Sequence, residues 1–116
     1  MKEVIWLGDS LKQLRAFPED IKDAVGYSLY LVQEGSIPKN TKVLKGFKPQ
    51  VLELVLEGQS GAYRSVYTIK ISDVVYVLHC FQKKSKQGIA TPMQEIEMIK
   101  QRLKQAEIVA KRSHTS

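Results

Sequence analysis

The chain has 116 residues, of which 43% are hydrophobic and 26% are charged, and its formal net charge is +6. This length suits one domain with its own core, and a sole cysteine, Cys80, excludes a fold that depends on internal disulfides. Because no apolar run approaches the roughly 18 residues of a membrane span, we expect a cytoplasmic protein that does not contact a membrane. The positive charge favours a polyanionic partner, but many basic domains of this size bind no nucleic acid.

The first third of the chain predicts a strand and then two helices. The apolar residues 4–7 are typical of a strand, and residues 8–10 follow with a turn and a helix N-cap. Pro18 interrupts the helical pattern, which then resumes and ends at Gly35. The apolar positions at helical spacing are Leu11, Leu14 and Phe17 before the interruption, and Ile21, Val25, Leu29 and Val32 after it.

The middle of the chain changes to the alternating pattern of strands. Residues 51–57 place three leucines on one face and Glu53 on the other, and residues 63–71 alternate in the same way. Residues 74–81 are apolar on both faces, which is typical of a central strand that is covered on both sides. Short turns between these segments predict an antiparallel meander, and residues 42–45 predict a further short piece at its edge.

The last part of the chain predicts one more helix, which begins with a capping box at residues 91–94 and has proline at its first position. The predicted order is therefore β-α-α-β-β-β-α. This is an α+β fold with a mainly antiparallel sheet, with helices packed on one face and the other face partly open. We expect one domain over residues 1–111 and a flexible tail over residues 112–116. The apolar stripe of the last helix consists of Ile96, Ile99, Leu103 and Ala106.

Arg64 is the first candidate for chemistry. Strand alternation places it on the face opposite Tyr63 and Tyr67, and that face is the open one if the tyrosines pack against the helices. Glu53, one strand away, would lie on the same face and orient the guanidinium. The alternative is an ordinary cross-strand ion pair, which contributes little to stability when it is exposed.

A cluster of lysines follows the central strand. Lys83, Lys84 and Lys86 bring three ammonium groups to the end of a strand that neighbours the strand of the candidate arginine. Such cations could hold phosphates and stabilise the extra negative charge of a phosphoryl-transfer transition state, although adjacent lysines at a strand end are usually solvated charge. Lys45 and Lys48 add positive charge from a loop ahead of the sheet.

Two further side chains have two interpretations each. His79 lies on the central strand, where a histidine is more often a satisfied core residue than a general base. Tyr67 is more often a core residue than a platform on which a base stacks. The sequence has no metal-ligand cluster, P-loop or dinucleotide-binding motif, so we expect no metal and no cofactor.

The chain carries four short motifs in a specific order and spacing. This pattern resembles the RelE/ParE superfamily of toxins, and most closely its phage-derived, HigB-like branch. The resemblance extends over nearly the whole chain. The motifs are Glu53-Leu54, then Tyr63-Arg64 with Tyr67, then Leu78-His79 with Phe81 and Lys83-Lys84, and last Thr91-Pro92 with Glu95-Ile96.

The resemblance implies a RelE-like fold and endonucleolytic cleavage of mRNA in the ribosomal A site, without a metal. By matching position, Arg64 is similar to the strand arginine that contacts the scissile phosphate, and Glu53 to a structural glutamate. Lys83 and Lys84 are similar to the basic positions after the last strand. A ribose 2′-hydroxyl would attack the adjacent phosphate while the cations stabilise the phosphoryl group. The implied partners are the ribosome with its mRNA and a cognate antitoxin, which in this branch is usually a helix-turn-helix DNA-binding protein.

The resemblance leaves proton transfer unassigned. Better-understood relatives place a tyrosine, histidine or acid near the C-terminus for this step, and we predict no such group in the helix over residues 91–110. His114, in the tail, is a poor candidate. Two other functions stay open, namely inhibition of DNA gyrase, as in ParE-like members, and a non-toxic domain that binds a partner or nucleic acid.

Overall fold

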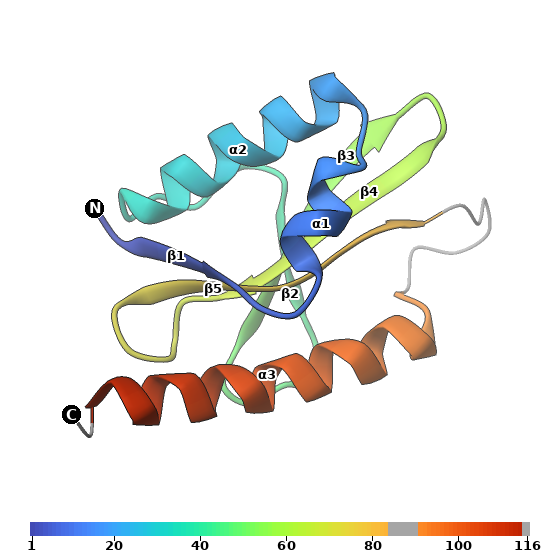
Figure 1. Ribbon diagram of the computed structural model, residues 1–116. Helices are drawn as coiled ribbons and strands as arrows, with labels where there is room; N and C mark the ends of the chain where they lie inside the picture. The colour runs from blue at the N-terminus through green and yellow to red at the C-terminus, as the bar shows by residue number, and fades with distance from the viewer. Residues whose placement is uncertain (84–90, 115–116) are drawn as a thin grey trace.

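The computed structural model describes residues 1–83 and 91–114, which form one sheet and three helices (Figure 1). The α+β class and the predicted meander are confirmed, and the short piece predicted at the sheet edge is strand β2. The elements in chain order are β1 (Glu3–Trp6), α1 (Ser10–Arg15), α2 (Glu19–Gln33), β2 (Thr41–Leu44), β3 (Val51–Gly58), β4 (Gly61–Thr68), β5 (Val74–Lys83) and α3 (Met93–His114).

The sheet has the strand order β1-β5-β4-β3-β2. Strands β2 to β5 pair antiparallel, whereas β1 pairs parallel with β5, which makes β5 a central strand as predicted. The β4–β5 register shifts by one residue between Val66 and Tyr67, because Val66 pairs with His79 while Tyr67 pairs with Val77. This β-bulge leaves Leu78 as the extra residue on β5, and bulges of this kind redirect side chains and free backbone groups.

Helices cover both faces of the sheet, with α1 and α2 on one side and α3 on the other (Figure 1). The prediction that all helices pack on one face and leave the other partly open is therefore wrong. The physical reason lies in the strands, since β5 is apolar on both faces and a sheet of that kind needs two covering layers. The core under α1 and α2 includes Leu14, Val25, Leu29, Leu54, Tyr63 and Tyr67, and the core under α3 includes Val51, Val66, Leu78, Phe81, Ile99 and Leu103.

The last helix is longer than predicted. It continues to His114, so the flexible tail expected from Arg112 does not begin there. Ala106 and Ala110 both pack into the core under this helix, which extends the predicted apolar stripe by one turn. Within residues 1–83 and 91–114, no helix is both long and apolar enough to span a membrane.

Candidate functional site

A buried ion pair joins Glu53 on β3 to Arg64 on β4. Arg64 Nη1 donates a hydrogen bond of 2.8 Å to Glu53 Oε1, and the two residues are only 4% and 2% exposed. Glu53 therefore orients the guanidinium as predicted. The expectation that Arg64 lies on an open face is wrong, because α3 covers that side of the sheet.

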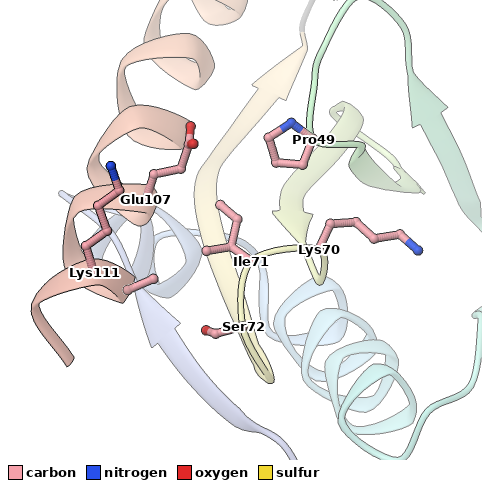
Figure 2. A pocket seen from close by; sticks show the side chains of 7 residues that line it. Pro49, Lys70, Ile71, Ser72, Glu107 and Lys111 are labelled. Carbon is pink, nitrogen blue, oxygen red and sulfur yellow. The ribbon is translucent and has the colours of Figure 1, made fainter. Parts of the chain in front are cut away.

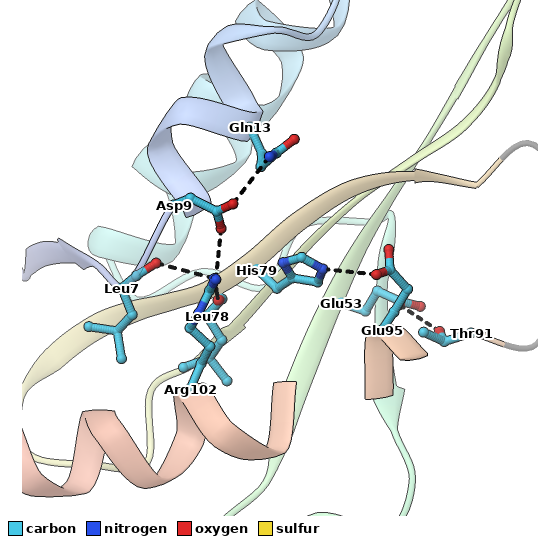
Figure 3. A network of polar contacts seen from close by, with 9 residues as sticks. All are labelled: Leu7, Asp9, Gln13, Glu53, Leu78, His79, Thr91, Glu95 and Arg102. Atoms are coloured by element: carbon cyan, nitrogen blue, oxygen red, sulfur yellow. Dashed lines mark hydrogen bonds and ion pairs between the residues drawn. The ribbon is translucent and has the colours of Figure 1, made fainter. Parts of the chain in front are cut away.

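The second carboxylate oxygen of Glu53 binds the start of α3. Thr91 Oγ1, two residues before that helix begins, donates a hydrogen bond of 3.0 Å to Glu53 Oε2 (Figure 3). One buried carboxylate thus connects β3, β4 and the segment that leads into α3. A carboxylate that accepts hydrogen bonds on both oxygens is held in one orientation, and so is the arginine that it binds.

His79 and Glu95 form a second polar contact on the same face of the sheet. His79 Nε2 lies 3.3 Å from Glu95 Oε1 of α3, and the imidazole stacks on Phe81 at a centroid distance of 5.2 Å (Figure 3). An ionised carboxylate can only accept, so Nε2 is the donor in this pair. In the described part of the chain, the buried Nδ1 of His79 has no hydrogen-bond partner.

The last helix does carry an acid beside the candidate residues, contrary to expectation. Glu95 lies in its first turn, and the fold brings it to a histidine 16 residues earlier in the chain. A carboxylate that holds one imidazole nitrogen leaves the other as a defined acceptor, which is the arrangement of a histidine that serves as a base.

Two lysines lie on the same sheet face as Arg64. Lys83 on β5 pairs with Ala62 on β4, which lies two positions before Arg64. Lys42 on β2 pairs directly with Glu53 on β3. Burial, and then the nearby charges of Arg64 and Lys42, hold the pKa of Lys83 below its usual value, while Glu53 acts against this shift. Lys42, Arg64 and Lys83 form an electropositive row across β2, β4 and β5 that could hold a phosphate group. We call these three cations, together with Glu53 on β3 that orients the arginine, the cationic row.

The remaining predicted residues do not join the cationic row. Tyr67 is buried in the core under α1 and α2, on the opposite face of the sheet, and this burial raises its pKa. Lys45 is exposed in the turn after β2, and Lys48 is exposed beside the middle of α3. Lys84 and Lys86 lie outside the described residues.

Arg102, which the sequence pattern did not single out, fixes α3 over this face. Its Nη1 donates to the backbone oxygens of Leu7, at 3.4 Å, and Leu78, at 2.9 Å, and its Nη2 donates to Asp9 Oδ1 at 2.7 Å (Figure 3). The β-bulge frees the Leu78 oxygen for this contact. The signal in the sequence was an arginine within the apolar stripe, three residues after Ile99 and directly before Leu103. Lys42 was also missed as a site residue, because its place opposite Glu53 depends on strand register.

The positions and partners of these residues define what the site could do. Cations line one face of three strands, a carboxylate orients the arginine, and a histidine–glutamate pair lies beside them. Among the side chains that the structure describes, those of residues 1–83 and 91–112, no group of three or more His, Cys, Asp or Glu is placed to hold a metal ion. The described groups suit charge stabilisation and proton transfer at a phosphate ester.

Comparison with known proteins gives one family and one fold. Residues 12–104 match the family described as Phage derived protein Gp49-like. The structure is similar to the crystal structure of the isolated E. coli RelE toxin, with a TM-score of 0.59 and 22% sequence identity, over 87% of this chain and 98% of that one. No curated protein matches the chain in sequence. Both findings agree with the RelE/ParE resemblance of the sequence motifs, and neither distinguishes the HigB-like branch.

Proposed function

We propose that this chain, which belongs to the Phage derived protein Gp49-like family and has the fold of the RelE toxin, is the toxin of a type II toxin–antitoxin system. The proposed activity is ribosome-dependent cleavage of mRNA in the cytoplasm, which stops translation. The proposed partners are the ribosome with its mRNA and a cognate helix-turn-helix antitoxin. The observation that supports this activity is the cationic row, in which Glu53 orients Arg64 beside Lys83 on one sheet face.

The proposed reaction is attack by a ribose 2′-hydroxyl on the adjacent phosphorus. A bond forms between the 2′-oxygen and phosphorus, the bond from phosphorus to the 5′-oxygen of the next nucleotide breaks, and that oxygen leaves as a hydroxyl after taking a proton from water. Negative charge builds up on the phosphoryl oxygens during this exchange, and Arg64 and Lys83 would stabilise it. Lys84, by the family pattern, would add a third cation.

The proposed proton acceptor is His79. Its Nδ1 has no hydrogen-bond partner within the described chain, and Glu95 holds the opposite ring nitrogen. Because Nδ1 is buried, this role requires RNA binding to open a path to it. Removal of the 2′-hydroxyl proton by a positioned base typically accelerates such a reaction by roughly 10²–10⁴-fold.

A second candidate function is favoured by the burial of Arg64. With 4% of its surface exposed and its Nη1 bound to Glu53, the arginine is held as a structural ion pair usually is. On this alternative the chain is a non-toxic domain that keeps the fold and binds a partner or nucleic acid.

The test is to induce the chain alone in bacteria and to map mRNA 5′ ends by primer extension. The proposal expects growth arrest with new cuts at codon spacing, and relief of both by Arg64→Ala. Arg64→Lys, which keeps a cation, should retain part of the activity. Thermal melting should show that both variants are folded at the growth temperature, although Arg64→Ala melts earlier than the wild type. Growth arrest with DNA damage signalling and intact mRNA would instead indicate gyrase inhibition. Normal growth despite abundant folded protein would support the non-toxic domain.

A further inference from the structure

Two adjoining hollows lie between α3 and the loops at the edge of the sheet. One has a volume of about 520 Å³ and lies between Pro49, the turn after β4 and the last part of α3 (Figure 2). The other has a volume of about 320 Å³ and lies between residues 46–48 and the middle of α3. They share Glu107, and the neighbouring residues Lys48 and Pro49 line one hollow each. They meet at Glu107 along α3, and we call the pair the α3 groove.

The α3 groove is long enough for a peptide segment. Its α3 wall runs from Glu97 to Lys111, which are 14 residues apart. At 1.5 Å per helical residue this wall is about 21 Å long. That length accommodates roughly six residues of extended chain or four turns of a second helix. The charged residues of this wall follow the spacing of one helical stripe, and they are Glu97, Lys100, Lys104, Glu107 and Lys111.

The apolar part of the groove is mainly aliphatic. Pro49, Ile71 and Ala110 line the larger hollow, and Leu103 and Phe47 line the smaller one. Phe47 is the sole aromatic side chain among these lining residues, so the groove offers little surface on which nucleobases could stack. Such a surface suits branched aliphatic side chains instead.

The polar edge of the groove is strongly basic. Five exposed lysines and two glutamates line it, an excess of three positive charges. Glu97 already forms an ion pair with Lys100 at 3.8 Å. Lys104 and Lys111 are exposed and form no ion pair with the described side chains of residues 1–83 and 91–112, so their charges face solvent along the wall. The five lysines are Lys48, Lys70, Lys100, Lys104 and Lys111.

We propose that the α3 groove binds an acidic, amphipathic peptide segment of a partner protein. Aliphatic side chains of that segment pack on Ile71 and Leu103, and its carboxylates face Lys104 and Lys111. Charge complementarity selects an acidic segment, and it disfavours a second copy of this chain, whose net charge is +6. The site lies outside the cationic row and does not depend on RNA cleavage.

The experiment uses the purified full chain and a fluorescent synthetic helix built from Glu, Leu and Ala. Fluorescence anisotropy measures affinity, and NMR amide shifts locate the site. We expect saturable binding that shifts the signals of Ile71 and Ala110 and weakens as salt increases. The double variant Lys104→Glu/Lys111→Glu should weaken binding by at least about tenfold, as expected for the loss of about 1.4 kcal/mol or more. The matched control Lys12→Glu/Lys39→Glu alters two exposed lysines elsewhere and should leave affinity unchanged.

Five outcomes would overturn the proposal. The acidic helix could fail to bind, or bind the charge-reversed groove as tightly as the original. A helix in which Lys replaces Glu could bind equally well, which would remove the role of charge. Oligouridylate could shift the same NMR signals at lower concentration, which would make the groove a nucleic-acid site. Sedimentation could show a dimer that buries the groove. None of these measurements uses ribosomes, so their result is independent of the proposed toxin activity.

Discussion

The guanidinium of Arg102 occupies the space that a side chain on Gly8 would need. A Cβ on Gly8 would overlap Cζ and Nε of Arg102, and Gly8 has a φ of +53°. An alanine in the left-handed backbone conformation costs about 1–2 kcal/mol of folding free energy by itself. Here Arg102 would also have to leave its hydrogen bonds. We expect Gly8→Ala to lower the free energy of unfolding by more than that amount in urea titrations.

Gly35→Ala is the matched control for this substitution. Gly35 has a φ of +90°, but nothing lies within 4 Å of the position of its Cβ. Gly35→Ala should therefore lower the free energy of unfolding only by the cost of placing alanine in the left-handed conformation. Equal losses in the two variants would mean that the contact between Gly8 and Arg102 imposes no packing requirement.

The contact between Arg102 and Asp9 should make stability depend on pH. The hydrogen bond from Arg102, followed by one from Gln13, holds the pKa of Asp9 below its usual value of 3.8. A carboxyl group whose pKa is lower in the folded state stabilises the fold above the unfolded value, and this contribution disappears as the pH falls through the folded value. The stability difference between the wild type and Asp9→Asn should therefore be largest above about pH 4 and shrink below it.

Urea unfolding across a pH series measures this difference. Asp23→Asn, on the exposed surface of α2, is the control and should show no comparable trend. A difference between wild type and Asp9→Asn that stays constant from neutral pH to about pH 2 would mean that the ion pair does not stabilise the fold.

Local sequence patterns predicted most of the elements because each depends on neighbouring residues. The apolar spacing of α2 and the alternation of β3 are of this kind. The number of covering layers was mispredicted, although residues 74–81 were recognised as apolar on both faces. A strand with two apolar faces requires helices on both sides, so the last helix had to cover the face that carries Arg64.

The candidate site was predictable only where it followed from strand alternation. Glu53 and Arg64 share a face because each lies on the polar side of its strand. The contact between Arg102 and Asp9 joins residues 93 positions apart, and no local pattern encodes it. Lys42 needed the β2–β3 register, and the His79–Glu95 contact needed the position at which α3 crosses β5.

The Glu53–Arg64 pair should show strong energetic coupling. Removal of one member of a buried ion pair leaves the other charge without its partner, which typically costs about 3–5 kcal/mol. We expect Arg64→Met and Glu53→Gln each to destabilise the fold, and the double variant to lose clearly less than the two losses together. Urea unfolding of the four proteins measures the coupling, and simple additivity would contradict it. Thr91→Val should cost about 1 kcal/mol, because it removes one hydrogen bond to Glu53.

Cys80 should be inert in the folded protein. Burial raises the pKa of its thiol to about 11, partly offset by the contact with Ser65 Oγ at 3.3 Å. The thiolate is the reactive form, so at pH 8 a thiol reagent should label the chain only as fast as it unfolds. Labelling rates should rise with urea in parallel with the unfolded fraction. Rapid labelling of the native protein in the absence of urea would show that this core is more open than the structure indicates.

His79 can be tested separately from its contact with Glu95. In His79→Gln the side-chain amide can still donate to Glu95, while the acceptor at Nδ1 is lost. We expect unfolding free energy close to the wild type, and mRNA cleavage in a reconstituted translation reaction reduced on the order of 10²-fold or more. Glu95→Gln keeps an acceptor for Nε2, so cleavage should fall less than in His79→Gln. Wild-type cleavage by His79→Gln, beside an inactive Arg64→Ala, would leave His79 a purely structural residue and require another proton acceptor.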